Sequence, residues 1–320
     1  DYILYAGINV FASVGSNILN ALKLSKYVDL GIKRHQKYEL LIHLAPIVTL
    51  FLYNATTVIF TSLDQVMLGF IKANESVGYY SAAIKIQNIL VSLITALGAV
   101  MLPKISYVLK NEGRKNFEQM IRKSFEFIII SAIPMCFLII ILAKEIIVVL
   151  AGKDYLPAIP MLQFLMPSLI FIGLSSVTAW QLLIPLGKEK YTVIGALAGV
   201  IVNLGLNSLM IPALGGVGAA VASTLAELAV LSVHVKALKD IVSRTFEKRE
   251  LLIAISSTLI ASGVVLVMKY NILVKVAFFA CVVYGVLFVG VYGVLLLLFR
   301  EKLASETLDS LKTMVIRKRG

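Results

Sequence analysis

The stretch VAFFACVVYGVLFVGVYGVLLLLF, Val276 to Phe299, contains no charged side chain. An α-helix needs about 20 apolar residues, at about 1.5 Å per residue, to cross the roughly 30 Å hydrocarbon core of a bilayer. Lipid offers no partner to bare backbone groups, and this run is far longer than the roughly 10 alternating residues of a membrane strand. It therefore predicts a membrane-spanning helix.

The composition of the chain predicts many such spans. Of its 320 residues 59% are hydrophobic and 15% are charged, whereas an ordinary soluble domain is about 45–50% apolar and about 25% charged. Apolar runs bounded by charges, Gly or Pro predict nine helices, and the fold class is therefore an all-α, polytopic transmembrane bundle. The predicted ranges are 2–22, 43–71, 78–102, 124–150, 158–186, 191–211, 216–238, 250–269 and 275–299.

The net charge of +12 is distributed unevenly between the predicted loops. About 24 Lys and Arg residues fall on one side of the membrane and about 5 on the other, which makes the basic side cytoplasmic and places Gly320 inside. This asymmetry accounts for the charge without a nucleic-acid partner. Two basic loops on that side, 23–42 and 103–123, also contain apolar residues and are predicted to be interfacial amphipathic helices on anionic lipid.

The sequence contains no recognisable motif for binding a cofactor or a metal ion. Cys136 and Cys281 lie in apolar runs and are interpreted as small hydrophobic residues, with neither a disulfide nor a metal site implied. The glycine-rich stretch Gly215–Ala220 follows no predicted strand and lacks the spacing of a dinucleotide loop. We expect no cofactor, no metal and no nucleotide-driven motor.

Two charged residues within predicted spans are the first candidate site. A central Asp costs about 2.5–3.5 kcal/mol on an insertion scale, and each Leu, Ile, Phe or Val around Asp64 returns about 0.3–0.6 kcal/mol, so the helix still inserts. Asp64 and Lys85 lie equally far from the turn near Asn74, and we expect them to meet across two antiparallel helices. They either staple this hairpin or line a wet cavity.

Further polar residues favour the cavity. Asn54, Thr57 and Thr61 recur with Asp64 at helical spacing, and Asn88 follows Lys85 by one turn. Glu227 lies mid-span without a base, either in the cavity or as a neutral side chain that hydrogen-bonds across helices. Asn203 and Asn207 either line the cavity or tie helices together. The expected cavity residues are Lys85, Asp64, Asn88, Asn54, Thr61, Glu227, Asn203, Asn207 and Gln181.

An ordered set of motifs resembles a known family. The set runs from SLDQVMLG through VGYYSAAIKIQNIL, VMLPKIS, WQLLIPLGKEK and NLGLNSLMIPALGGVGAAVAS to Glu227, over about residues 40–240. In these motifs the chain resembles the Wzx-type polysaccharide flippases of the multidrug/oligosaccharidyl-lipid/polysaccharide (MOP) exporter superfamily. Such proteins have two six-helix lobes around a central cavity, often with two extra helices.

The resemblance implies an arrangement of the chain. Residues 1–42 are expected to hold the last helix of the N-terminal lobe and an amphipathic linker, 43–240 the six-helix C-terminal lobe, and 241–320 two additional helices with a basic tail. Most of the N-terminal lobe would then be missing, and we expect the chain to be part of a longer protein. Lys85 stands at the position where relatives place a cavity base, which implies binding of a pyrophosphate.

The implied function is a flippase, not an enzyme, of the bacterial cytoplasmic membrane. It would move a polyprenyl-diphosphate-linked oligosaccharide to the outer leaflet for O-antigen or capsule synthesis, with the polysaccharide polymerase machinery as a further candidate partner. A cation-coupled drug exporter of the same superfamily, with Asp64 and Glu227 as ion sites, is the alternative. A membrane glycosyltransferase would need acids and arginines in large outer loops, where the chain has few.

Overall fold

The computed structural model describes residues 2–24, 62–72, 74–272 and 274–305. The chain divides into two compact units, Asp1–Thr56 and Thr57–Gly320, each considered by itself below. In the first unit the described residues form one helix, α1 (Tyr2–Leu24). Residues 25–61 lie outside the described ranges. This gap contains the expected amphipathic helix 23–42, except for its first two residues, and most of the predicted helix 43–71.

The second unit is built from helices throughout its described residues. It begins with the helical segment Ser62–Ile71. The elements that follow are α3 (Asn74–Asn111), α4 (Arg114–Ile141), α5 (Ala143–Leu150), η2 (Lys153–Tyr155), α6 (Ala158–Leu165), α7 (Ser168–Ser176), the π-helical η3 (Val177–Leu183), α8 (Lys190–Leu214), α9 (Gly216–Ala237), α10 (Lys239–Thr245), α11 (Lys248–Asn271) and α12 (Ala277–Leu298).

Seven helical stretches among the described residues are long and apolar enough to cross a membrane. They correspond to the seven predicted helices from 78–102 onward, and the predicted 216–238 and 250–269 agree with α9 and α11 to within about two residues at each end. The prediction of an all-α membrane bundle is confirmed. The proposed domain limits at residues 42 and 240 stay a prediction.

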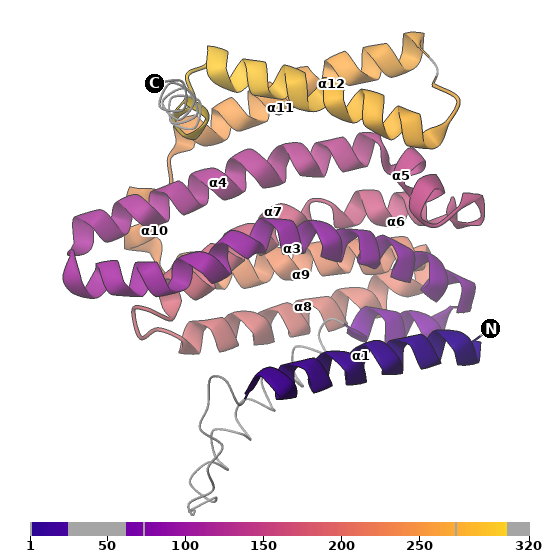
Figure 1. Ribbon diagram of the computed structural model, residues 1–320, viewed down its shortest axis with the longest axis horizontal. Coiled ribbons are helices and arrows are strands. Elements are labelled where there is room, and N and C mark those ends of the chain that lie inside the picture. Colours follow the sequence, from indigo (N-terminus) through magenta and orange to yellow (C-terminus); the bar gives the residue numbers. More distant parts are fainter. Residues whose placement is uncertain (1, 25–61, 73, 273, 306–320) are drawn as a thin grey trace, which may run out of the picture. The chain divides into compact units, whose positions relative to one another are not determined.

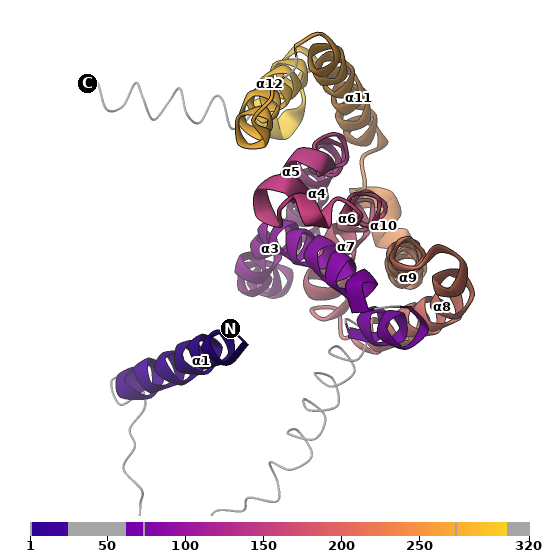
Figure 2. The same cartoon turned by 90° about the vertical axis from the view of Figure 1, so that its right-hand side faces the viewer.

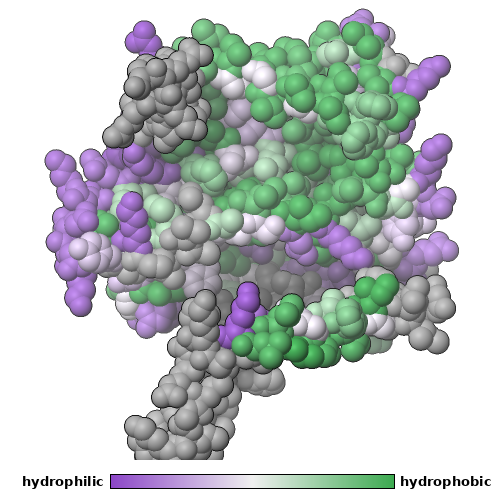
Figure 3. All heavy atoms as spheres, in the orientation of Figure 1, coloured by the Kyte–Doolittle hydropathy of each residue, from purple (hydrophilic) through white to green (hydrophobic). Residues whose placement is uncertain are grey.

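Helix α4 forms the middle of the second unit (Figures 1 and 2). On one side it packs against α11 and on the other against α3 and α7, and α12 pairs with α11 and also contacts α5. The hairpin of α8 and α9 packs through α9 onto α6 and α7. Hydrophobic side chains cover the visible faces of α11 and α12, while hydrophilic ones gather at the helix ends (Figure 3).

The region 103–123 differs from the prediction of an interfacial helix. Helix α3 continues to Asn111, and α4 already begins at Arg114, so the basic segment belongs to the ends of two long helices. Gly113 makes the turn between them with a φ of 86°, a conformation that glycine adopts without steric cost. Both helices therefore continue beyond their apolar stretches into the charged segment between them.

The predicted helix 158–186 is broken into shorter pieces. Pro167 lies between α6 and α7, where its missing N–H and its ring interrupt the helical hydrogen bonds. The stretch continues as the π-helical η3, where Thr178 and Gln181 are buried. Pro134, in contrast, lies inside α4 without ending it. The break places the side chains of α7 and η3 on faces that a single straight helix would not give.

Helices α8 and α9 approach closely because small residues lie on their shared face. A Cβ on Gly218 would lie 2.5 Å from the backbone oxygen of Met210, so only glycine fits without a shift. The turn between the two helices uses Gly215 with a φ of 57°. The buried positions of α8 recur every fourth residue, as expected for one helical face. They are Gly195, Gly199, Asn203, Asn207 and Ile211.

Candidate functional site

Asp64 is buried among neutral hydrogen-bond donors. Its side chain is 5% exposed. The Tyr80 hydroxyl donates to Oδ2 at 2.7 Å, and the Ser223 hydroxyl donates to the same oxygen. The amide nitrogens of Asn203 and Asn207 donate to Oδ1 at 2.8 Å and 2.6 Å. Both carboxylate oxygens are therefore satisfied by neutral donors.

Four separate segments supply this cluster. Asp64 comes from the segment Ser62–Ile71, Tyr80 from α3, the two asparagines from α8 and Ser223 from α9. The asparagines also bond to one another, with Asn207 Nδ2 donating to Asn203 Oδ1 at 3.0 Å. The Asn207 Oδ1 atom is buried and has no hydrogen-bond partner among the described residues. The cluster therefore ties residues that are up to 159 positions apart in the sequence.

A cavity of about 360 Å³ lies beside this cluster. Its size falls within the range of about 300–1,000 Å³ that is usual for small-molecule sites. Asp64, Asn203 and Glu227 contribute polar side chains to its lining, and α3, α6 and α7 also contribute apolar ones. The lining residues are Asp64, Tyr80, Ile84, Gln87, Asn88, Val91, Leu165, Ile172, Asn203, Ser223 and Glu227.

The expected pair of Asp64 and Lys85 is not formed. Lys85 is exposed on α3 and makes no hydrogen bond or ion pair with any described residue, and Asp64 has only neutral partners. The prediction compared the depths of the two Cα atoms and neglected side-chain reach. Tyr80 stands five residues before Lys85, about 7.5 Å along the helix at 1.5 Å per residue, and its long side chain covers most of that offset.

The other predicted cavity residues divide into three groups. Asn88, Asn203 and Glu227 line the cavity together with Asp64. Asn207 donates a hydrogen bond to Asp64 but does not line the cavity itself. Gln181 is buried on η3 and does not line the cavity either. Asn54 and Thr61 lie outside the described residues. Glu227 makes no hydrogen bond within the described part of the chain, so its interpretation as a neutral tie between helices gains no support.

Three residues of the site were missed. Tyr80 and Gln87 share a helical face with Ile84 and Val91, and that spacing could have identified them. Gln87 donates from Nε2 to the Ser168 hydroxyl at 2.6 Å. Ser223 stands one turn before Glu227, and this was the available signal for it. No group of three or more His, Cys, Asp or Glu side chains in the described ranges could hold a metal ion.

Comparison with known proteins places this geometry in context. A model of the family described as "Polysaccharide biosynthesis protein" matches residues 5–160. The structure of a lipid II flippase, MurJ, in an inward closed conformation superposes with a TM-score of 0.70 at 20% identity, covering 84% of this chain and 58% of that one. The chain has the same fold as this flippase. The resemblance that its sequence motifs predict is thereby confirmed.

Two further proteins are similar to this chain in sequence. An uncharacterised membrane protein of Methanocaldococcus jannaschii is 23% identical over 243 residues, which are 75% of this chain and 48% of the relative. The "Probable low-salt glycan biosynthesis flippase Agl15" of Haloferax volcanii is 25% identical over 202 residues, 63% of this chain and 43% of the relative. The chain spans about half the length of these two relatives.

Proposed function

We propose that this chain belongs to a flippase that moves a polyprenyl-diphosphate-linked oligosaccharide to the outer leaflet of the cytoplasmic membrane by alternating access. The observation that carries the proposal is the polar cavity beside Asp64 at the level of apolar helices. Carboxylate and amide groups inside a membrane bundle mark substrate pathways, because they are costly there and hydrogen-bond hydroxyl groups well. The flippase names of two similar proteins support this class.

In this proposal the sugar and the diphosphate contact different residues. Asn88, Asp64 and Glu227 provide hydrogen-bonding groups for sugar hydroxyls in the cavity. Lys85, one turn before Asn88 on α3, is exposed and without a bonded partner among the described residues, so its ammonium group is available for the diphosphate. The glycan would enter surface polysaccharide synthesis, with the polymerase machinery receiving it. We propose transport without catalysis and a cytoplasmic C-terminus.

The test is exchange of Lys85 for Ala in the complete protein in its native cells. Surface polysaccharide should fall at equal expression, because the diphosphate loses its counter-charge, while Lys85→Arg should retain part of the export. Lys104→Ala is the matched control, since Lys104 is also an exposed base on α3 but lies beyond the part of the helix that lines the cavity, which runs from Tyr80 to Val91 and includes the level of Lys85. Unchanged export by Lys85→Ala would remove the diphosphate role.

A cation-coupled drug exporter is the second candidate. It is favoured by the presence of two acids, Asp64 and Glu227, in one cavity that no base lines. Drug resistance conferred on a strain without its native pumps, and lost in Glu227→Gln, would favour the exporter. Absence of resistance combined with lost surface glycan in Lys85→Ala would favour the flippase.

A further inference from the structure

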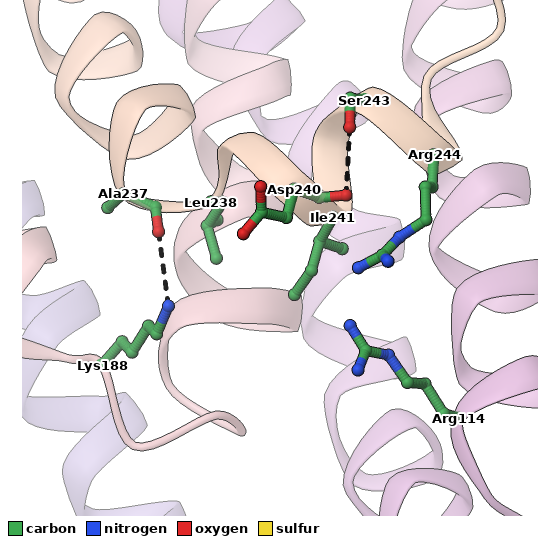
Figure 4. Close-up of a pocket in the computed structure, with 8 residues that line it drawn as sticks. All are labelled: Arg114, Lys188, Ala237, Leu238, Asp240, Ile241, Ser243 and Arg244. Atoms are coloured by element: carbon green, nitrogen blue, oxygen red, sulfur yellow. Dashed lines mark hydrogen bonds between the residues drawn. The ribbon is translucent and has the colours of Figure 1, made fainter.

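A second pocket lies at the end of the helices, away from the cavity beside Asp64. It has a volume of about 440 Å³ and is formed by the first residue of α4, the loop before α8, the end of α9 and the short helix α10 (Figure 4). Three bases line it, Arg114, Lys188 and Arg244, against one acid, Asp240. None of these residues belongs to the proposed transport site.

The two arginines have terminal guanidinium nitrogens that point toward each other. Arg114 Nε donates to Glu118 Oε1 at 3.1 Å, and Arg244 Nε lies 3.6 Å from the same oxygen. The terminal guanidinium nitrogens of both residues have no bonded partner among the described residues, and they face one another across the pocket (Figure 4). The Glu118 carboxylate forms an ion pair with both arginines and offsets part of their mutual repulsion, and an anion between the terminal nitrogens would offset more of it.

Lys188 and Asp240 complete the wall. Lys188 Nζ donates to the Ala237 carbonyl at 3.4 Å, a long bond that leaves donors available. The Asp240 carboxylate accepts no hydrogen bond from a described residue, and its place beside the bases suits a ligand that combines an anion with a hydroxyl donor. The side chains therefore fit a phosphate ester with hydroxyl groups better than a simple anion.

The pocket lies where the apolar spans end. Helix α9 ends at Ala237, α4 begins at Arg114 and α8 begins at Lys190, all in or next to the pocket wall. Spans of about 20 residues end at the edge of the hydrocarbon core, where the lipid phosphates are. Exposed apolar residues flank the bases on these helices, such as Val193 on α8 and Val235 on α9.

We propose that this pocket binds the phosphate group of an anionic membrane lipid, with the two guanidinium groups clamping the phosphate and Asp240 accepting from a headgroup hydroxyl. Guanidinium groups bind phosphate oxygens through paired N–H donors, which gives geometry as well as charge. The bound lipid would fix the α9–α10 junction to the start of α4.

The test measures binding of short-chain phosphatidylglycerol to the full chain in detergent. Phosphatidylglycerol should bind more tightly than phosphatidylcholine of equal chain length. The double exchange Arg114→Gln and Arg244→Gln should weaken that binding about 25-fold, because it removes two bases at the phosphate and each charge contributes about fivefold. Inorganic phosphate should compete about tenfold more weakly than the lipid, because it lacks acyl chains that partition beside the spans.

The matched control is Lys110→Gln with Lys115→Gln, two exposed bases at the same helix ends but outside the pocket. If both double exchanges weakened phosphatidylglycerol binding equally, the effect would come from general surface charge and the proposal would be overturned. Free phosphate that binds as tightly as the lipid would assign the pocket to a soluble ligand and overturn it as well.

A gain-of-binding variant guards against misfolding as an explanation. Asp240→Asn removes the only acid from the lining and should tighten binding of phosphatidic acid, which has no headgroup hydroxyl, by about fivefold. It should tighten phosphatidylglycerol less, because the hydroxyl loses its acceptor. An unchanged preference between these two lipids would contradict the role of Asp240.

Discussion

Two charged clusters hold the second unit together by different means. At Asp64 a buried carboxylate is satisfied by hydroxyl and amide donors alone. At Glu247, between α10 and α11, the carboxylate bonds to Arg122 of α4 and to Lys302, whose Nζ lies 2.9 Å from Oε2. Both clusters join helices that are far apart in the sequence, and only the second uses ion pairs.

The difference follows from the solvent around each cluster. Asp64 is 5% exposed, so a basic partner would bring a second charge with its own desolvation cost. Neutral donors supply the hydrogen bonds without that cost. The Glu247 side chain is 21% exposed and that of Lys302 is 47% exposed, so water reaches both charges and weakens their attraction. The interior cluster should therefore contribute more to stability and respond less to salt.

The largest effect on the free energy of unfolding is expected for Asp64→Ala, which tests the contrast between the two clusters directly. It removes the acceptor that the donors of Tyr80, Asn203 and Asn207 share, and each donor left unsatisfied costs about 1–3 kcal/mol. Relaxation of the donors toward one another reduces the sum, and we expect a loss of about 2–4 kcal/mol in free energy of unfolding. Unfolding in mixed micelles measures it, with Asp64→Asn as the control that keeps one acceptor oxygen. A loss below that of Glu247→Gln would refute the contrast.

The second test disturbs the helices that carry the asparagines. Gly218→Ala puts a methyl group against the Met210 carbonyl and should cost about 1–3 kcal/mol, since backbone must shift. Gly205→Ala in α8 is the control, because nothing lies within 4 Å of its added Cβ. It should stabilise the protein by about 0.5–1 kcal/mol through helix propensity. Thermal unfolding followed by Trp180 fluorescence compares the two, and equal effects would contradict the close approach.

The smallest effect on stability is expected at the more exposed cluster around Glu247. Glu247→Gln should cost about 1 kcal/mol at pH 7 and low salt, and less in 1 M salt, where the Debye length falls to about 3 Å. The same salt should leave the cost of Asp64→Ala unchanged. A Glu247 contribution that is independent of salt would show that its ion pairs are not the source.

Glu247 also predicts a pH dependence. The hydrogen bond from Lys302 holds the pKa of the Glu247 carboxyl below its ordinary value, with Arg122 adding to this and burial opposing it. A depressed folded-state pKa stabilises above the unfolded value of about 4.3, and the contribution disappears as pH falls through the folded value. The difference in stability between wild type and Glu247→Gln should therefore narrow below about pH 4. A constant difference down to pH 3 would contradict this assignment.

The apolar helices were predictable because lipid leaves few alternatives for a long apolar run. Helices α9 and α11 match their predicted ranges for this reason. The early start of α4 at Arg114 was not predictable from hydropathy, since its first turns bear charges. The break at Leu142 between α4 and α5 also escaped prediction, because neither Gly nor Pro marks it.

At the site, the sequence predicted which polar residues lie inside spans but not how they pair. Asn203 and Asp64, both among the expected cavity residues, line the same pocket. The partner of Asp64 depended on helix rotation and on the length of the Tyr80 side chain, and neither can be read from residue spacing. Lys85 was misplaced for the same reason, because equal distance from the turn does not fix the direction in which α3 presents a side chain.

The donors on Asp64 have a consequence for how a transporter of this fold could change shape. Hydrogen bonds weaken steeply over a few tenths of an ångström, and here they join four segments at a single carboxylate. Sliding of α3, α8 and α9 past one another would break them all at once. These helices are therefore expected to move as one rigid body, with the hinges outside the cluster.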